Sequence, residues 1–484
     1  MSAVEFDKAS PETITALRAA LAEAGFDTAL LSRAEAVGPR LLDPIRLPVV
    51  RSWLRDQDGH GYLLARLFAY SDTVPDASLR DALGDVALDG LAAAGMLEQH
   101  EDSWRSLFRL VPFVGLWIAS DPMEAEGDPV MGPGATTQEL AQAMPATPGG
   151  AVLDVGSGAG SLALVAAAAG ATNVVGVDLH PRAAQVGNFN AALNKLEAEF
   201  RTGDLTAPAA GLKFDLVVAQ PPFVVQPPEV AGTTYLHGGP RGDELSLRLF
   251  SELPAVLKDS GRALVLYETP DEPSVATRRV ADTLGEGCHR LMIVATPGHD
   301  AAMAAIGYAA VAHPSLDSAY ATAAEHYYKH LCSLGGTAMH LLVDLRRDSD
   351  ATQAKAIAVE RRSLNGLNAT RLIALEAAVD LASADEEALL NAPLRLPPGT
   401  AIEQRQAFDD GRVELRLHMA DPGLDTQVLS DAAAVIVDAL SKPANGQAVL
   451  RAYADAADAT PDEVRPSVVS FLRGALASGM IAPS

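Results

Sequence analysis

Three glycines, Gly156, Gly158 and Gly160, are set two residues apart in a Gly-x-Gly-x-Gly pattern. They follow an apolar run at 151–155 that reads as a buried strand, and they precede an alanine-rich helical pattern at 161–169. Glycines let the chain turn sharply out of the strand, and they let a ligand approach the backbone without meeting a Cβ atom. The amide groups at the start of the helix then face that ligand. The pattern therefore predicts a ligand site at this turn.

Two carboxylates follow the next predicted strands. Asp178 ends the second strand, 18 residues after Gly160, where a carboxylate can accept hydrogen bonds from both hydroxyls of a ribose. Asp204 follows the third strand and could accept from an adenine amino group. Because the carboxyl ends of parallel strands meet at one edge of a sheet, we expect both side chains near the glycine turn.

The fourth predicted strand runs directly into Gln220, Pro221, Pro222 and Phe223. Two successive prolines fix the backbone as it leaves the sheet edge. The preceding amide can then direct its side chain and its carbonyl at a nitrogen of the bound substrate. The ring of Phe223 offers a face on which a planar group can stack. This turn is predicted to meet the substrate.

An alternation of strand and helix patterns from residue 151 to about 347 must position these residues. Such alternation indicates a mostly parallel sheet with helices on both faces, and ligands bind at the carboxyl ends of its strands. The predicted fold class is α/β, with a Rossmann-like sheet of seven strands. The predicted strands are 151–155, 173–178, 199–201, 214–219, 262–268, 290–295 and 338–345, and the predicted helices are 161–169, 181–195, 243–258, 272–284 and 318–331.

With these motifs the chain resembles the class I S-adenosylmethionine-dependent methyltransferases. It is similar to their "methyltransferase small domain" branch, which includes release-factor glutamine and ribosomal-RNA guanine methyltransferases. Their hallmark is Asn/Asp-Pro-Pro-Tyr/Phe at the end of the fourth strand. The resemblance spans about 127–344 and is strongest over 153–223.

The resemblance implies S-adenosylmethionine as the cofactor, with its methionine part bracketed by the segment 154–160, its ribose held by Asp178 and its adenine by Asp204. The implied cofactor-binding residues are Asp154, Gly156, Ser157, Gly158, Gly160, Asp178, Leu179, Asp204, Leu205 and Gln220, and the implied catalytic residues are Gln220, Pro221, Pro222 and Phe223. From their position in the insertion after the Pro-Pro turn, Tyr235 and His237 are expected to line the acceptor pocket together with Phe223. No metal site is predicted.

The sequence departs from the family at Gln220, where Asn or Asp is usual. Glutamine keeps the amide donor and acceptor but extends them by one methylene. A shift of about 1 Å at a reacting centre can lower a rate steeply. Either the acceptor differs from the usual planar amine or Gln220 works from a shifted backbone. The acceptor atom, whether nitrogen, oxygen or carbon, stays open at this point.

The segments on either side of the α/β pattern predict two accessory domains. Residues 1–121 read as a helical, winged-helix-like domain that ends in a two-stranded hairpin, and 122–347 form the cofactor domain. Residues 348–484 form a small α+β or winged-helix-like domain; 348–396 leans towards helix, and Asp409-Asp410-Gly411 is a turn signal between strands.

The connection at 121–148 is rich in proline and glycine. Within it, Thr136 or Thr137 is expected to cap a short helix at 138–143. The connection is either a plain linker or a loop that closes over the cofactor.

Composition limits the class of partner. The chain has 484 residues and a formal net charge of -25, with no cluster of Lys and Arg. Acidic charge argues against a nucleic-acid partner, which a basic face would favour. The two cysteines exclude a disulfide framework and suit a reducing cytoplasm. We expect no leader segment and no membrane span.

The predicted function is methyl transfer to a small molecule or a peptide, most simply to a nitrogen. The alternatives are a protein-glutamine or ribosomal-RNA base methyltransferase, and a non-enzymatic winged-helix protein that binds nucleic acid. A nicotinamide dehydrogenase or a non-catalytic scaffold would also use the glycine turn, but the Pro-Pro turn has no role in a dehydrogenase. The N-terminal domain is the candidate surface for a homodimer.

Overall fold

The computed structural model describes residues 4–37, 46–122, 125, 128–284, 289–314, 316–347, 355–406 and 413–484. The chain divides into two compact units. The first comprises Met1–Ala141, Ala146–Leu291 and Gly298–Ala356, and the second comprises Gln142–Pro145, Met292–Pro297 and Ile357–Ser484. The expected boundary between residues 121 and 122 lies within the first unit, and the three-domain division stays a prediction.

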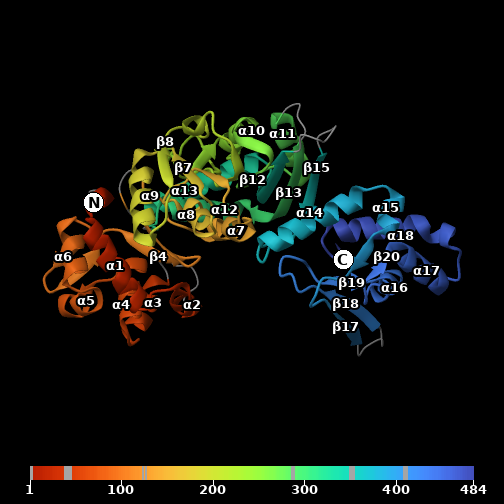
Figure 1. The fold of residues 1–484 in the computed structure, drawn as a ribbon, viewed down its shortest axis with the longest axis horizontal. Helices are drawn as coiled ribbons and strands as arrows, with labels where there is room; N and C mark the ends of the chain where they lie inside the picture. Colours follow the sequence, from red (N-terminus) through yellow and green to blue (C-terminus); the bar gives the residue numbers. More distant parts are fainter. Residues whose placement is uncertain are drawn as a thin grey trace. The chain divides into compact units, whose positions relative to one another are not determined.

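The α/β part is built on an eight-stranded sheet with the order β15-β13-β14-β12-β9-β6-β7-β8 (Figure 1). Its strands are β6 (Ala151–Val155), β7 (Asn173–Asp178), β8 (Glu199–Thr202), β9 (Phe214–Ala219), β12 (Leu257–Thr269), β13 (His289–Asp300), β14 (Thr337–Arg347) and β15 (Lys355–Glu360). Neighbours from β12 to β8 run parallel, whereas β14 runs antiparallel to β12. The seven predicted strands are confirmed. The expected total of seven is wrong, because β15 falls where the sequence leans towards helix; its six residues are too few to show a clear period.

Helices cover the sheet where the sequence predicts them. The five predicted helices are α8 (Ser161–Ala168), α9 (Pro181–Asn194), α10 (Glu244–Val256), α11 (Pro273–Leu284) and α13 (Ser318–Ser333). The structure adds α12 (Ala301–Ala312), whose alanine-rich sequence has no polar face to reveal a period. It also adds the parallel pair β10 (Val224–Val225) and β11 (His237–Gly239), which fixes the insertion after the Pro-Pro turn.

The N-terminal part contains helices and a small antiparallel sheet of order β1-β3-β2. Its elements are α1 (Pro11–Glu23), α2 (Thr28–Val37), α3 (Leu47–Arg55), α4 (His60–Leu64) with the continuing helical turn η2 (Ala65–Ala69), β1 (Val74–Pro75), α5 (Asp76–Leu83), α6 (Asp85–Ala93), β2 (Leu97–His100), β3 (Ser103–Ser106), β4 (Arg109–Phe113) and β5 (Leu116–Ser120). The β4–β5 hairpin is separate from this sheet.

This part packs directly on α9, within the same unit (Figure 1). The buried rings of Phe6, Phe108 and Phe189 meet edge to face, with centroids 5.2–6.4 Å apart. The side chain of Asn190 on α9 accepts from the amide of Ala119 at 2.7 Å and donates to its carbonyl at 2.8 Å. Buried aromatic contacts and satisfied polar contacts make these two parts one packed body.

The second unit has its own helical core. It contains α14 (Ala369–Ser383), α15 (Glu386–Asn391), α16 (Asp431–Ala439), α17 (Gly446–Ala456) and α18 (Pro461–Ala477), with the sheets β20-β16-β21 and β17-β18-β19. The strands are β16 (Pro393–Arg395), β17 (Ala401–Gln406), β18 (Val413–His418), β19 (Gln427–Leu429), β20 (Ala444–Asn445) and β21 (Ala482–Pro483). The predicted turn Asp409-Asp410-Gly411 lies outside the described residues. Among the helices of the described residues, none combines the length and apolar character that crossing a membrane requires.

Candidate active site at the carboxyl edge of the sheet

The glycine turn connects β6 to α8 in a left-handed backbone conformation. The φ angles of Gly156, Gly158 and Gly160 are 74°, 50° and 79°. The amides of Gly156 and Ser157 both donate to the carbonyl of Val177 on β7, at 2.8 and 3.0 Å. The turn is therefore fixed by glycine's freedom at positive φ and by its tie to the next strand.

The three glycines have different surroundings. A Cβ at Gly156 would come no closer than 3.6 Å to another atom, and that atom is the carbonyl oxygen of Gln220. At Gly158 it would lie 3.3 Å from the carbonyl oxygen of Met131. At Gly160 it would lie 2.6 Å from the ring of Phe200, so this glycine gives room to a packed side chain. Gly156 and Gly158 thus lie beside backbone carbonyls, whereas Gly160 allows the helix and strand to pack around the ring of Phe200.

Asp178 ends β7 with its carboxylate aimed back at the glycine turn. Its Oδ2 accepts from the amide of Gly158 at 2.9 Å, and its Oδ1 accepts from the amide of His180 at 2.9 Å. A carboxylate offers about four acceptor positions, so room remains for ribose hydroxyls. The next residue, Leu179, is 57% exposed despite its apolar side chain. An exposed apolar surface beside a fixed carboxylate suits a base and its ribose.

Asp154 lies within β6 and is fully buried. Its Oδ2 accepts from the amide of Ala163 at 2.9 Å, in the first turn of α8. Burial raises the pKa of Asp154 to about 7, and the nearby charge of Asp178 adds to this effect, although the bond from Ala163 opposes it. The side chain thus links the strand to the first turn of the helix and stabilises the glycine turn between them.

Asp204 and Leu205 follow β8 at the same edge. The Oδ1 of Asp204 accepts from the guanidinium of Arg248 on α10, and both side chains are about half exposed. Leu205 is buried and adopts a φ of 42°. The structure therefore places Asp204 at the predicted edge, but with an ion-pair partner that a ligand amino group would have to share.

The side chain of Gln220 has two partners on a helix far away in the sequence. Its Oε1 accepts from the hydroxyl of Thr137 at 3.0 Å, and its Nε2 donates to the hydroxyl of Thr136 at 2.6 Å. Both threonines lie in α7 (Ala135–Ala143). The prediction that one of them caps a helix starting at 138 is wrong, because the helix begins earlier and includes them both.

His237 is fixed in the insertion that follows the Pro-Pro turn. Its Nδ1 accepts from the amide of Thr233 at 3.0 Å, so its Nε2 carries the proton and donates to the hydroxyl of Tyr327 at 2.7 Å. The two rings are also stacked. Burial lowers the pKa of His237 and raises that of Tyr235, so both are neutral near neutral pH.

A partly buried polar cluster was not predicted. His340 on β14 contacts Glu139 of α7 through Nε2 at 2.9 Å and Glu268 of β12 through Nδ1 at 3.5 Å. Glu268 also accepts from the hydroxyl of Tyr308. Burial would lower the pKa of His340, but the bonds to the two carboxylates outweigh it and raise this pKa to about 9. Its members are 32 to 201 residues apart, so no local pattern reveals it.

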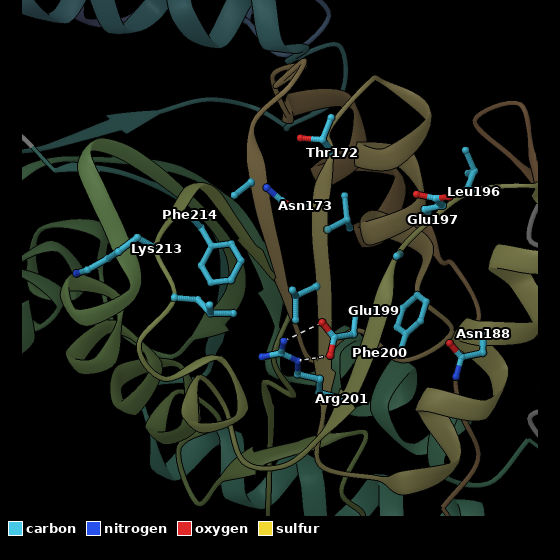
Figure 2. A pocket seen from close by; sticks show the side chains of 15 residues that line it. Thr172, Asn173, Asn188, Leu196, Glu197, Glu199, Phe200, Arg201, Lys213 and Phe214 are labelled. Carbon is cyan, nitrogen blue, oxygen red and sulfur yellow. Dashed lines mark hydrogen bonds and ion pairs between the residues drawn. The ribbon is translucent and has the colours of Figure 1, made fainter.

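Two members of this cluster, Glu268 and Tyr308, lie beside the Pro-Pro turn around a narrow gap that is too small to hold a water molecule. Phe223, Arg241, Glu268, Thr269 and Tyr308 are among the residues that line it. A second hollow, of about 880 Å³, lies at the opposite edge, where the strands begin (Figure 2). Asn173, Glu199, Arg201, Lys213 and Phe214 line it, and Glu199 and Arg201 pair with each other there. The residues with predicted chemistry therefore gather at the carboxyl edge, away from this hollow.

A mostly parallel sheet, a glycine turn after its first strand and a carboxylate after its second define a Rossmann-like, cofactor-binding α/β class. Residues 133–235 match the methyltransferase small domain family, and residues 46–107 match a domain of unknown function, DUF7059. Over 133–235 the chain is thus similar to the methyltransferase small domain family.

Relatives of known name match about a quarter of the chain. A Methanocaldococcus jannaschii protein, provisionally named a protein N5-glutamine methyltransferase, is 34% identical over 122 residues, which cover 24% of this chain and 61% of the relative. The release factor glutamine methyltransferase of Deinococcus radiodurans is 34% identical over 134 residues, covering 26% and 48%. The chain thus matches less than two thirds of either relative. A solved ribosomal protein L11 methylase from Lactobacillus delbrueckii subsp. bulgaricus has a TM-score of 0.25 at 19% identity, covering 43% of this chain and 75% of that one.

Proposed function

We propose that the protein is an S-adenosylmethionine-dependent methyltransferase that methylates a nitrogen of a small molecule or a peptide. The observation that carries this proposal is the meeting of two turns at one sheet edge. The carbonyl of Gln220 lies 3.6 Å from the position that a Cβ on Gly156 would take, so the two turns border one space. When bound, S-adenosylmethionine supplies an electrophilic methyl group.

The chain's own residues suit that cofactor. Gly156 leaves its backbone open to a ligand, Asp178 has acceptor positions for ribose hydroxyls, and Leu179 offers an exposed apolar surface for the adenine. The remaining proposed cofactor residues are Asp154, Ser157, Gly158, Gly160, Asp204, Leu205 and Gln220. Asp154 and Gly160 would act by shaping the turn, since their contacts are to the protein itself.

The turn from Gln220 to Phe223 would position the acceptor. Methyl transfer to an amine needs in-line placement of its lone pair more than it needs a proton carrier. Pro221 and Pro222 fix the backbone, which holds the carbonyl of Gln220 close to the glycine turn. Phe223 lies beside Glu268 and Tyr308, and we expect its ring to form one wall of the acceptor site. Tyr235 and His237 would line the same site as neutral side chains.

The acceptor class rests on charge and on the names of the relatives. A formal net charge of -25 favours a cationic or neutral acceptor over nucleic acid. Methylation of a protein glutamine, as the relatives' names suggest, is the main alternative, followed by a ribosomal-RNA base. We place both flanking parts, each with a three-stranded sheet beside helices, among winged-helix-like modules that support the enzyme, the N-terminal one as a dimer surface. We expect the protein to act in the cytoplasm.

Calorimetric titration with S-adenosylmethionine and S-adenosylhomocysteine tests the cofactor. We expect micromolar binding that Asp178→Ala weakens about 30-fold. Well-folded protein that binds neither ligand would contradict the proposal. Binding to heparin or DNA at low salt tests the acceptor class separately, because a strong, salt-sensitive association would favour a nucleic-acid acceptor instead.

A further inference from the structure

Gln220 differs from its counterparts in the family by its longer side chain, and the structure shows what that length reaches. The amide extends from the end of β9 to the first turn of α7, where each of its two polar atoms bonds a threonine hydroxyl, at 2.6 and 3.0 Å. An asparagine would end one methylene, about 1.5 Å, short of both hydroxyls. The bonds therefore depend on the residue that departs from the family pattern.

The segment before α7 lies on the glycine turn. The carbonyl oxygen of Met131 lies 3.3 Å from the position of a Cβ on Gly158. Val130 is tied to the buried carboxylate of Asp121, which accepts from its amide at 3.0 Å. The carboxylate of Asp128 accepts from the amide of Thr234 in the acceptor-side insertion at 3.3 Å. Segment 128–134 thus runs along both halves of the site, and α7 continues directly from it.

We propose that the side chain of Gln220 is a positioning residue that fastens α7, and with it segment 128–134, over the bound cofactor, while its backbone carbonyl meets the acceptor nitrogen. This inference rests on the proposed function. The proposal explains why Gln replaces Asn or Asp here, since the shorter side chains would not form the two hydrogen bonds to α7.

A second attachment of α7 provides an internal comparison. Glu139 on α7 bonds His340, which in turn contacts Glu268. This attachment is an ion pair and does not involve Gln220. The two attachments are therefore chemically distinct, and each can be removed without touching the other.

The first experiment measures amide hydrogen exchange of α7 in ligand-free protein. We expect Gln220→Ala to speed exchange of the α7 amides about tenfold, because two hydrogen bonds to α7 are lost with partial compensation by water. Thr136→Val combined with Thr137→Val should speed exchange at least as much, because the hydroxyl of Thr137 also accepts from the amide of Gly134 at 3.2 Å. Adding Gln220→Ala to this pair should add nothing further. Gln220→Asn should behave like Gln220→Ala. Thr322→Val, which removes a hydroxyl bonded only to its own helix, should leave α7 unchanged.

The second experiment measures dissociation of S-adenosylhomocysteine by stopped flow. We expect the Gln220 variants and the double threonine variant to release it about tenfold faster than wild type, with melting temperatures that differ by only a few degrees. Glu139→Gln should speed release as well, and its effect should add to that of Gln220→Ala because the attachments are independent. A merely structural role would change the melting temperature and leave the dissociation rate unaltered.

The outcomes separate this inference from the proposed function. If the threonine variants leave exchange and release unchanged, or if their effects add fully to that of Gln220→Ala, the fastening role is overturned even where wild type binds S-adenosylhomocysteine. If wild type does not bind it, the proposed function fails, and coupled exchange would then mark only a structural contact, which also overturns the inference.

Discussion

The glycine turn and the turn from Gln220 to Phe223 lie at the same edge of the sheet but are built differently. The glycine turn is held by groups from β6, β7 and α8, all within a short stretch of chain. The turn at Gln220 depends on Thr136 and Thr137, more than 80 residues away, and borders on Glu268 and Tyr308 from later elements. One half of the site is specified locally, and the other half is assembled from distant parts.

This difference indicates where variation can occur. Changing the glycine turn alters backbone conformation, for which few sequences substitute. Changing the assembled half alters side chains on separate elements, so that half can vary while the local half stays constant. Gln220 in place of Asn or Asp is such a change.

The largest expected effect concerns the local half and depends on pH. Burial raises the pKa of Asp154 from 3.8 to about 7, so its contribution to stability is complete below about pH 4 and is lost as the pH rises through 7. Between about pH 4 and pH 8, ionisation of Asp154 should lower the free energy of unfolding of wild type by roughly 4 kcal/mol. Asp154→Asn should not show this loss. Urea unfolding over a pH series measures it.

Asp215→Asn is the control with the opposite sign. The bond from Lys258 lowers the pKa of Asp215, so its contribution is present at neutral pH and is lost only as the pH falls through the folded-state pKa. If the free energy of unfolding of Asp154→Asn changes with pH as steeply as that of wild type, Asp154 is not the source of the loss.

Gly160→Ala should destabilise the protein by about 3 kcal/mol, because the new Cβ would meet the ring of Phe200 and the backbone has a positive φ. The matched change Gly149→Ala also falls at positive φ, 70°, but finds no atom within 4 Å. It should cost only about 1 kcal/mol. Thermal unfolding of both variants measures the loss of stability, and equal losses of stability would refute the packing role of Gly160.

Asp178→Ala should weaken S-adenosylhomocysteine binding about 30-fold, or about 2 kcal/mol, by removing ribose contacts and the anchor for the amide of Gly158. Asp204→Ala should weaken it only about threefold, because its carboxylate already pairs with Arg248 at the surface. Calorimetric titration compares the two. A larger loss in Asp204→Ala would reverse this ranking.

The smallest expected effect belongs to the assembled half. Tyr327→Phe removes the hydroxyl that accepts from Nε2 of His237, leaving a partly buried donor without that partner, and should cost about 1 kcal/mol of stability. Tyr328→Phe, at a side chain 47% exposed, should be neutral. Thermal unfolding measures stability, and the imidazole NMR signals should move in the first variant alone.

Much of the α/β part could be predicted because its signals are local. Strand and helix alternate with clear periods, and the glycines and Asp178 stand at fixed offsets from one another. β15 could not be predicted, because its six residues carry no decisive period. α12 could not be predicted for a related reason: a helix of alanines and other apolar residues has no polar face, so its sequence shows no helical period.

The sequence by itself determined the glycine turn and the place of Asp178 at the carboxyl edge of the sheet, because a tight turn at positive φ demands glycine and a strand end places its last side chain at a known position. Only the tertiary structure decided the partners of Gln220, the packing contact that requires a glycine at Gly160, and the cluster around His340. Each of these joins residues from elements far apart in the chain, and hydrogen bonds and ring packing across such distances depend on how the elements fold together.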